Sequence, residues 1–298
     1  MKFREILIVH NPASGNHNPD ELKVLIEEKL SSKDISFEYI QTSPEKDVVK
    51  ITKNFDAVLV MGGDGTVMNV VSKVLDEKAN ISVLLIPLGT GNLLSRAIGI
   101  PLDPEQAINA QLSAVKTNKL DVGKLHTNNS YFMVSVGIGL DAEMIKHADR
   151  KQKDTFGFFA YIISGIKSIS NRKKRTFELS LDGEMQTVRA HSIMIFNAAR
   201  LEVVNAQIGP EVNPQDGNFD VAILRDTSPV GFMLSLFRLI SGSLKEEGEL
   251  EYLQAKEITV RSSGAANVQV DGDLVQMDDI AVSVLKNAIS FMYIEKNS

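Results

Sequence analysis

Apolar residues in the first part of the chain occur in short runs, separated by segments whose apolar positions recur at helical spacing. The runs that predict buried parallel strands are residues 5–9, 35–40, 56–60 and 81–86. Five helices are predicted. Four of them begin at Asn18, at Ser43, at Thr66 and near Leu93, and the fifth spans residues 103–114. Strands separated by helices form a parallel sheet with both faces covered, so this part predicts a three-layer α/β domain.

The pattern changes near residue 120, after which strand-like runs dominate. The predicted strands are residues 130–136, 177–181, 188–196, 219–224, 257–261, 268–270, 281–285 and 289–294. Turn signals such as Asp182-Gly183 and Asp271-Gly272 join neighbouring strands. Helical inserts are predicted at residues 155–170 and 229–242. We therefore predict an α/β domain over residues 1–122 and an antiparallel β-sandwich over residues 123–298, whose last strand is a candidate to return to the first domain.

Composition narrows the class of protein. The formal net charge is -6, which gives no overall indication of nucleic-acid binding. The chain has no cysteine, which excludes disulfides and thiolate metal sites. No apolar run reaches the roughly 18 residues of a membrane span, and the first residues are a poor match to a signal peptide. These features favour a soluble cytoplasmic protein and leave its oligomeric state open, a homodimer included.

Three loops that follow predicted strands carry the candidate chemistry: residues 10–16, 62–66 and 87–92. Open α/β sheets bind ligands at the edge formed by the carboxyl ends of their strands. Glycines let backbone N–H groups turn toward an anion, and a helix N-terminus adds partial positive charge. Asp64 would repel a bare phosphate, so its presence suggests a divalent cation on a nucleotide or a hydroxyl that it orients. The loops predict phosphoryl transfer.

Each loop also has a structural interpretation. Residues 11–15 taken alone are typical of a plain turn, and residues 89–92 suit a helix cap as well as a ligand loop. The Gly-Gly-Asp-Gly-Thr segment at residues 62–66 is the specific one. No Gly-x-x-x-x-Gly-Lys-Ser/Thr is present, which excludes a Walker-type site. No Gly-x-Gly-x-x-Gly follows the first strand, which disfavours dinucleotide oxidoreductase chemistry.

Further short motifs follow these loops in a fixed order. The set comprises Asn11-Pro12-Ala13-Ser14-Gly15, Gly62-Gly63-Asp64-Gly65-Thr66 with Asn69, Pro87-Leu88-Gly89-Thr90-Gly91-Asn92, Leu120-Asp121-Val122-Gly123, Gly137-Ile138-Gly139, Asp216-Gly217-Asn218-Phe219-Asp220 and Val270-Asp271-Gly272-Asp273. In these motifs the chain resembles the diacylglycerol-kinase-type lipid kinases, especially their soluble bacterial members, over nearly its whole length. The resemblance implies a Rossmann-like ATP-binding domain of the NAD-kinase and diacylglycerol-kinase type, then a β-sandwich, with the active site between them.

The resemblance also assigns roles to residues. The residues that would contact ATP are Asn11, Pro12, Ser14, Gly15, Thr42, Gly62, Gly63, Asp64, Gly65, Thr66, Asn69 and Thr90. Asp64 and Asp121 would form an acidic cluster that organises the catalytic Mg²⁺ through water. Asp273 would be the general base, at a place where the family usually carries glutamate. A structural Mg²⁺ site would use the Asp216 side chain and main-chain oxygens of Asn213 and Asn218.

Without the resemblance, these carboxylates have structural interpretations. Asp273 would be part of a type I′ hairpin, Asp216-Gly217 a plain turn, and Asp121 a solvated residue at the domain boundary. Two departures from the family also concern the acceptor side. Residues 43–48 replace a usual Gly-His-Ala stretch, and residues 197–204 replace a usual glycine run. The acceptor lipid therefore stays open.

The leading hypothesis is an ATP- and Mg²⁺-dependent lipid kinase that phosphorylates diacylglycerol or a related lipid, with phosphatidylglycerol and sphingoid bases less favoured. The alternatives are a NAD kinase and a non-catalytic nucleotide or lipid sensor.

A basic cluster, Lys167 with residues 172–175, follows the apolar residues 156–163. It suits reversible docking on anionic lipid, although a core helix with a solvated loop explains it equally. We expect a membrane lipid substrate, reversible peripheral attachment and no nucleic-acid partner.

Overall fold

The computed structural model describes residues 3–42, 51, 55–114, 116–139, 174–198, 202–203, 206–207, 212–225, 250–264 and 267–292 of the 298-residue chain. The chain divides into two compact units. The N-terminal unit comprises Met1–Leu120 with Asn287–Ser298, and the C-terminal unit comprises Asp121–Lys286. The predicted helices at Ser43, 155–170 and 229–242 lie outside the described residues, as do Lys167, Arg172 and Lys173 of the basic cluster.

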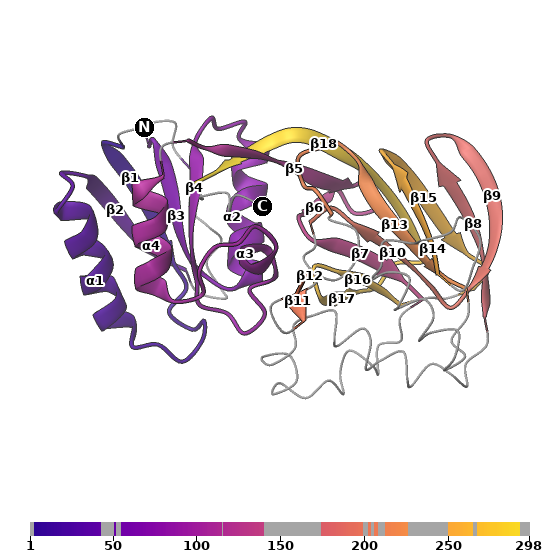
Figure 1. Cartoon of the computed structure of the whole chain (residues 1–298), viewed down its shortest axis with the longest axis horizontal. Helices are drawn as coiled ribbons and strands as arrows, with labels where there is room; N and C mark the ends of the chain where they lie inside the picture. The colour runs from indigo at the N-terminus through magenta and orange to yellow at the C-terminus, as the bar shows by residue number, and fades with distance from the viewer. Residues whose placement is uncertain are drawn as a thin grey trace. The chain divides into compact units, whose positions relative to one another are not determined.

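The N-terminal unit is built on a parallel sheet. Its strands, in order across the sheet, are β2 (Ser36–Gln41), β1 (Glu5–His10), β3 (Ala57–Gly62) and β4 (Ser82–Pro87). The end of β18 (Asp279–Phe291) pairs in parallel with β4, where Ser290 lies opposite Ser82. Helices α1 (Pro19–Ser31) and α4 (Pro104–Ser113) pack side by side on one face, and α2 (Asp64–Asp76) covers the other (Figure 1). Every residue of β3 and β4 is buried, which explains their uninterrupted apolar sequences.

The helix starts follow local signals. The Asn18 side chain accepts the Asp20 N–H at 3.1 Å, with Pro19 in the first turn of α1. Asp103 caps α4 in the same way by accepting the Gln106 N–H at 2.9 Å. The prediction for α2 was two residues late. Because extended Gly63 is its N-cap, the helix begins at Asp64 and its first turn includes part of the glycine loop.

The C-terminal unit consists of antiparallel strands in two sheets. One sheet has the order β14 (Leu250–Ala255), β13 (Phe219–Leu224), β10 (Ser192–Phe196), β7 (Ser135–Ile138), β16 (Val268–Val270), β17 (Asp273–Val275). The other contains β18, β15 (Glu257–Ser262), β8 (Arg175–Leu181) and β9 (Glu184–Ala190), with β5 (Asn118–Leu125) paired to β18 and β6 (Ser130–Phe132) paired to β5. A short pair, β11 (Glu202–Val203) and β12 (Ala206–Gln207), is separate.

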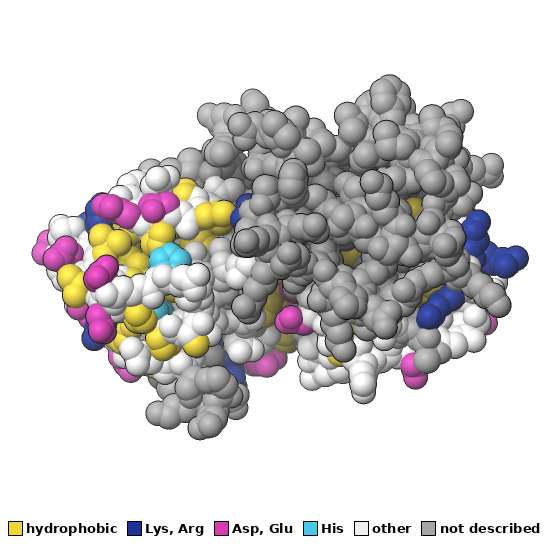
Figure 2. Space-filling model, turned by 90° about the horizontal axis from the view of Figure 1, so that it is seen from below, with side chains coloured by type: hydrophobic (Ala, Val, Ile, Leu, Met, Phe, Trp, Pro, Cys, Tyr) yellow, Lys and Arg dark blue, Asp and Glu magenta, His cyan; other side chains and the backbone are white. Residues whose placement is uncertain are grey.

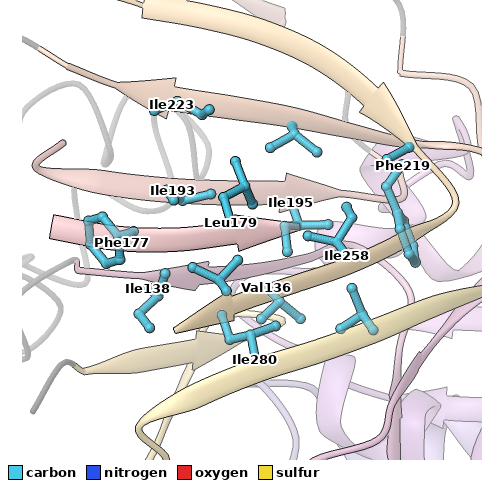
Figure 3. Close-up of a cluster of buried hydrophobic side chains, with 14 of the residues drawn as sticks. Val136, Ile138, Phe177, Leu179, Ile193, Ile195, Phe219, Ile223, Ile258 and Ile280 are labelled. Atoms are coloured by element: carbon cyan, nitrogen blue, oxygen red, sulfur yellow. The ribbon is translucent and has the colours of Figure 1, made fainter. Parts of the chain in front are cut away.

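Side chains from both sheets form one core. Phe177 and Ile258 come from one sheet, and Val136 and Ile193 come from the other (Figure 3). Complete burial of an isoleucine or phenylalanine side chain contributes about 1.5–3 kcal/mol, so this shared core holds the two sheets face to face. The predicted fold class, a Rossmann-like α/β domain followed by an antiparallel β-sandwich, is confirmed.

Four predicted strands were wrong in extent. Residues 130–136 form two strands, β6 and β7, that are separated at Met133 and Val134. Residues 188–196 also form two strands, because the chain leaves one sheet at His191 and enters the other. Conversely, residues 281–285 and 289–294 were predicted as separate strands, but β18 runs through Asn287, whose left-handed φ of 52° marks the passage between units.

Helix α4 is fixed to the sheet by a buried polar side chain. Gln111 is 1% exposed; its Oε1 accepts the Leu85 N–H at 2.8 Å, and its Nε2 donates to the Leu85 carbonyl at 2.7 Å. β18 pairs with β4 at Ser82 and Val83, two residues before Leu85. The Gln111 amide therefore gives Leu85 the hydrogen bonds that a neighbouring strand would make.

Replacing Gln111 with alanine should lower the free energy of unfolding of the N-terminal unit by about 2–4 kcal/mol, because two buried backbone groups lose their partners. Urea denaturation followed by circular dichroism measures the change. Gln106→Ala, at an exposed position of the same helix, is the control and should stay within about 0.5 kcal/mol of wild type. Equal stability of both variants would contradict the role assigned to Gln111.

Candidate functional site

The first two predicted loops meet at the point where the sheet order reverses. From β1 the chain crosses to β2, whereas from β3 it crosses to β4 on the other side, so the carboxyl ends of β1 and β3 diverge. This is the topological switch point at which open α/β sheets bind ligands. Asn11 follows β1 and donates its N–H to the Met61 carbonyl at 2.8 Å. Its Nδ2 donates to Thr66 Oγ1 at 3.1 Å, which joins the first loop to the start of α2.

The third loop packs against the other two through glycines. A Cβ on Gly89 would lie 2.7 Å from the Gly63 Cα, so a side chain at Gly89 would push the two main chains apart. A Cβ on Gly15 would lie 2.1 Å from the Leu88 carbonyl oxygen, and Gly15 has a φ of +73°. The structure therefore brings the three loops together, and their glycines are required for backbone contact as well as for turning.

Asp64 holds the start of α3 (Leu93–Ala97). Its Oδ1 accepts the Leu94 N–H at 3.3 Å, and a Cβ on Gly91 would lie 3.0 Å from its Oδ2. The side chain is half-buried. Asp64 therefore does not lie in a simple solvent-facing loop, because its carboxylate links α2 to the loop that precedes α3.

One position in this edge is open. Among the residues that the structure describes, a Cβ on Gly65 would meet no heavy atom within 4 Å, and Gly65 is exposed. Asp64, Gly65 and Thr66 form the first turn of α2, where backbone N–H groups lack partners within the helix. An anion can approach these groups without displacing a side chain.

The remaining predicted ATP contacts lie at the same edge of the N-terminal unit. Thr42 donates its N–H to the His10 carbonyl at 2.8 Å, which places it next to the first loop. Pro12 and Ser14 follow β1, Thr90 follows β4, and Asn69 lies in the second turn of α2. Seen from below, the N-terminal unit shows histidine atoms among hydrophobic and uncharged side chains, with acidic side chains mostly toward the margin (Figure 2).

His10 begins the first candidate loop, but no role of its own was predicted for it. It is 1% exposed and its Nδ1 is hydrogen-bonded to the Tyr39 hydroxyl. Burial lowers the pKa of His10, so the ring is neutral at pH 7. A polar residue at the end of an apolar strand was the available signal, and its role is to support the first loop.

Asp121 belongs to the C-terminal unit and is fully buried, so the solvated alternative is wrong. Its Oδ2 accepts the Gly217 N–H at 2.7 Å, and its own N–H donates to the Pro214 carbonyl at 2.7 Å. The structure therefore brings Asp121 to the predicted structural Mg²⁺ loop. Asp64 lies in the other unit.

The Mg²⁺ loop has the donor types that this ion prefers, a carboxylate and main-chain oxygens. Asp216 Oδ1 accepts the Asn218 N–H at 2.8 Å, and Asn213 Oδ1 accepts the Gln215 N–H at 3.1 Å. Lys286 Nζ donates to the Asp216 carbonyl at 3.1 Å, which adds positive charge. Among the described residues no three His, Cys, Asp or Glu side chains gather as a metal site, so Mg²⁺ here would rely on main-chain oxygens and water.

Asp220, at the end of this motif, is 2% exposed, and its side chain lies on the face of β13 opposite to the core residues Phe219 and Val221. Burial raises the pKa of its carboxyl group, and Gln254 Nε2 donates to its Oδ1 at 2.8 Å. The tyrosine beside it, Tyr252, likewise has its pKa raised by burial. These residues support the strand that follows the loop and were not predicted.

Asp273 begins β17 and is exposed. It pairs with Val270 across a turn in which Asp271 and Gly272 have φ values of 48° and 92°, as a type I′ hairpin requires. The hairpin is therefore as the sequence predicts, and the catalytic role of Asp273 stays a prediction.

This combination of a glycine-lined switch point and an antiparallel sandwich defines an open α/β protein with a second, all-β unit. Comparison with protein families narrows the class. Residues 5–125 match the diacylglycerol kinase catalytic domain, and residues 134–293 match the YegS C-terminal NAD kinase beta sandwich-like domain. The chain belongs to the diacylglycerol kinase catalytic-domain family, in its form with this C-terminal sandwich.

Individual relatives span nearly the same length. A Streptococcus pneumoniae protein provisionally named a lipid kinase is 28% identical and covers 96% of this chain and 97% of its own. A Staphylococcus aureus protein with the same provisional name is 27% identical over 83% of each chain. A solved structure from Bacillus anthracis str. Sterne, provisionally named a diacylglycerol kinase, has a TM-score of 0.81 at 22% identity and covers 99% of this chain and 97% of its own. Among the described helices, none is both long and apolar enough to cross a membrane.

Gly89→Ala should lower the free energy of unfolding by about 1–3 kcal/mol, because the added methyl group overpacks the contact with Gly63. The matched control is Gly65→Ala, whose methyl group enters open space at the start of a helix and should leave stability unchanged or raise it by up to about 1 kcal/mol. Thermal unfolding of the two variants beside wild type measures both effects. A Gly89→Ala variant as stable as Gly65→Ala would contradict the packing of the loops.

Proposed function

We propose that the protein is an ATP- and Mg²⁺-dependent lipid kinase that transfers the γ-phosphoryl group to a hydroxyl of diacylglycerol or a related lipid. The observation that carries the proposal is the set of three loops held together at the switch point, with the first turn of α2 open at Gly65. The kinase family of the chain and the names of its relatives support the same activity.

The N-terminal unit would bind the nucleotide. Backbone N–H groups in the first turn of α2 point to the anion, and the helix N-terminus contributes partial positive charge. Asp64 and Thr66, on that turn, would hold the phosphate-bound Mg²⁺ or its waters. Mg²⁺, when bound, neutralises the charge of the transferred group. Most of the binding then depends on main-chain geometry, which the close contact of Gly63 and Gly89 fixes.

The C-terminal unit would supply the base. A lipid hydroxyl is too weakly acidic to attack readily, so a carboxylate that accepts its proton is useful. In the proposed step, Asp273 takes that proton while the hydroxyl oxygen bonds to the γ-phosphorus. The bond between this phosphorus and the bridging oxygen breaks, and ADP leaves with the electron pair. Because its acceptor is a membrane lipid, the protein would attach reversibly to a bilayer surface.

Two alternatives remain testable. A NAD kinase is suggested by the Gly-Gly-Asp-Gly loop and by the description of the sandwich family. The first and third loops favour the lipid kinases. A non-catalytic sensor would keep the fold and bind nucleotide without transfer.

Incubation with radiolabelled ATP and Mg²⁺ distinguishes the lipid kinase, the NAD kinase and the sensor hypotheses. The acceptors are mixed micelles of diacylglycerol, phosphatidylglycerol or a sphingoid base, and NAD in solution. We expect labelled phosphatidic acid that is absent when EDTA is added. Labelled NADP instead would identify a NAD kinase, and bound nucleotide without any labelled product would identify a sensor.

Asp64→Asn should lower turnover by at least about 100-fold, because it removes the charge that organises the metal. It keeps an oxygen for the Leu94 N–H, so its melting temperature should stay near that of wild type. Asp64→Ala loses that hydrogen bond as well and should be less stable by about 1 kcal/mol. Phosphate transfer and thermal unfolding measured on both variants test this separation. Asp64→Asn with near wild-type turnover would refute the catalytic assignment.

A further inference from the structure

The C-terminal unit contains two hairpin turns with the same sequence and backbone. Asp182-Gly183 joins β8 to β9, and Asp271-Gly272 joins β16 to β17. The aspartates have φ values of 50° and 48°, and the glycines 93° and 92°. In both turns the aspartate also accepts hydrogen bonds from a segment distant in sequence, so its side chain fastens the turn to a neighbouring part of the sandwich.

The Asp271 carboxylate is engaged by consecutive backbone donors. Its Oδ2 accepts the Met133 N–H, and its Oδ1 accepts the N–H groups of Val134 and Ser135, each at 2.9 Å. In return, the Asp271 N–H donates to the Ser135 carbonyl at 2.8 Å. Met133 and Val134 form the break between β6 and β7, and Ser135 begins β7, so Asp271 binds the main chain where the strand is interrupted. Bonds to an ionised acceptor are stronger than neutral ones, so this attachment is firm.

Two buried amides extend the attachment. Gln269, which is 1% exposed, accepts the Gly272 N–H at 2.8 Å and donates to Ser135 Oγ at 3.1 Å. Asn197, which is fully buried, donates from its Nδ2 to the carbonyls of Met133 at 2.8 Å and Asp121 at 2.9 Å. Hydrogen bonds therefore run from the Asp271 turn through the break to Asp121.

Resting on the proposed function, we propose that Asp271 is a positioning residue for the base Asp273. Asp273 comes two residues after the anchor and is itself exposed, so its own surroundings leave the side chain accessible to an acceptor. What fixes its main chain is the turn, and the turn is fixed by Asp271. A displacement of about 1 Å at a reacting group can cost about 100-fold in rate.

Asp271→Asn tests this proposal, because Asn-Gly is the preferred type I′ sequence and preserves the turn while weakening its anchor. With 1,2-dioleoylglycerol in mixed micelles as acceptor, we expect kcat to fall about 10- to 100-fold. The dissociation constant for ATP should stay within about twofold of wild type. The double variant D271N/D273N should be no slower than D273N alone, since a positioning residue has nothing left to position. D271S provides a second variant if D271N folds poorly.

Asp182→Asn is the matched control. Asp182 Oδ1 alone accepts the N–H groups of Lys256 and Glu257 at 2.9 and 2.8 Å, so asparagine keeps this acceptor oxygen and changes the charge of the anchor in the other hairpin. We expect D182N to lower the melting temperature less than D271N, which loses the Oδ2 acceptor of the Met133 N–H, and D182N to keep wild-type kcat.

The outcomes are distinguishable. Equal losses of kcat in D182N and D271N, multiplicative losses in D271N/D273N, or wild-type kcat in D271N would each overturn the positioning role while leaving the kinase assignment intact. Wild-type kcat in D273N would instead show that Asp273 is not the base, and the positioning role of Asp271 would then be contradicted as well. Absence of any transfer by the wild-type protein contradicts the proposed function on which the inference rests.

Discussion

The arrangement of the three loops in the N-terminal unit depends on direct contacts between their main chains, at glycines where a side chain would not fit. At Gly63 and Gly89 the loops after β3 and β4 approach so closely that one methyl group would separate them. At Gly15 the first loop meets the carbonyl of Leu88 in the same way. Loops fixed by such contacts present their N–H groups in a set direction before any ligand arrives, so less ordering is needed on binding.

The sequence predicted those features that are local. Strands β13 and β16 coincide with predicted runs, and the Asn18 cap follows from neighbouring residues. The glycine loops could be placed because parallel strands end at one edge. The split at His191 was not predicted, because the buried residues Val188 and Ala190 before it and Ile193 after it continue one apolar pattern although they join different sheets. β5 was missed because its apolar positions are interrupted by polar ones.

The buried polar contacts could not be predicted from the sequence, because their partners are distant along the chain. Gln111 bonds to Leu85, 26 residues away, and Asp121 bonds to Gly217, 96 residues away. Asp64, Asp121 and Asp271 were each noticed within a motif, yet all three carboxylates accept main-chain N–H groups of distant segments. A motif indicates that a carboxylate has a role, but it does not show whether that role depends on the negative charge or on accepting hydrogen bonds. Substitution by asparagine separates these two contributions, because it removes the charge and keeps one acceptor oxygen.

Strand β18 determines how the N-terminal unit can be produced as a separate fragment, because this strand comes from the end of the chain. Its last residues close the sheet of the N-terminal unit beside β4, and Met292 donates its N–H to the Val83 carbonyl. A fragment that stops at the end of the first unit would lack this strand and leave the backbone of Ser82 and Val83 without its partner. Open sheet edges invite pairing between molecules. The N-terminal unit is therefore best isolated with residues 287–298 grafted onto it, rather than by simple truncation.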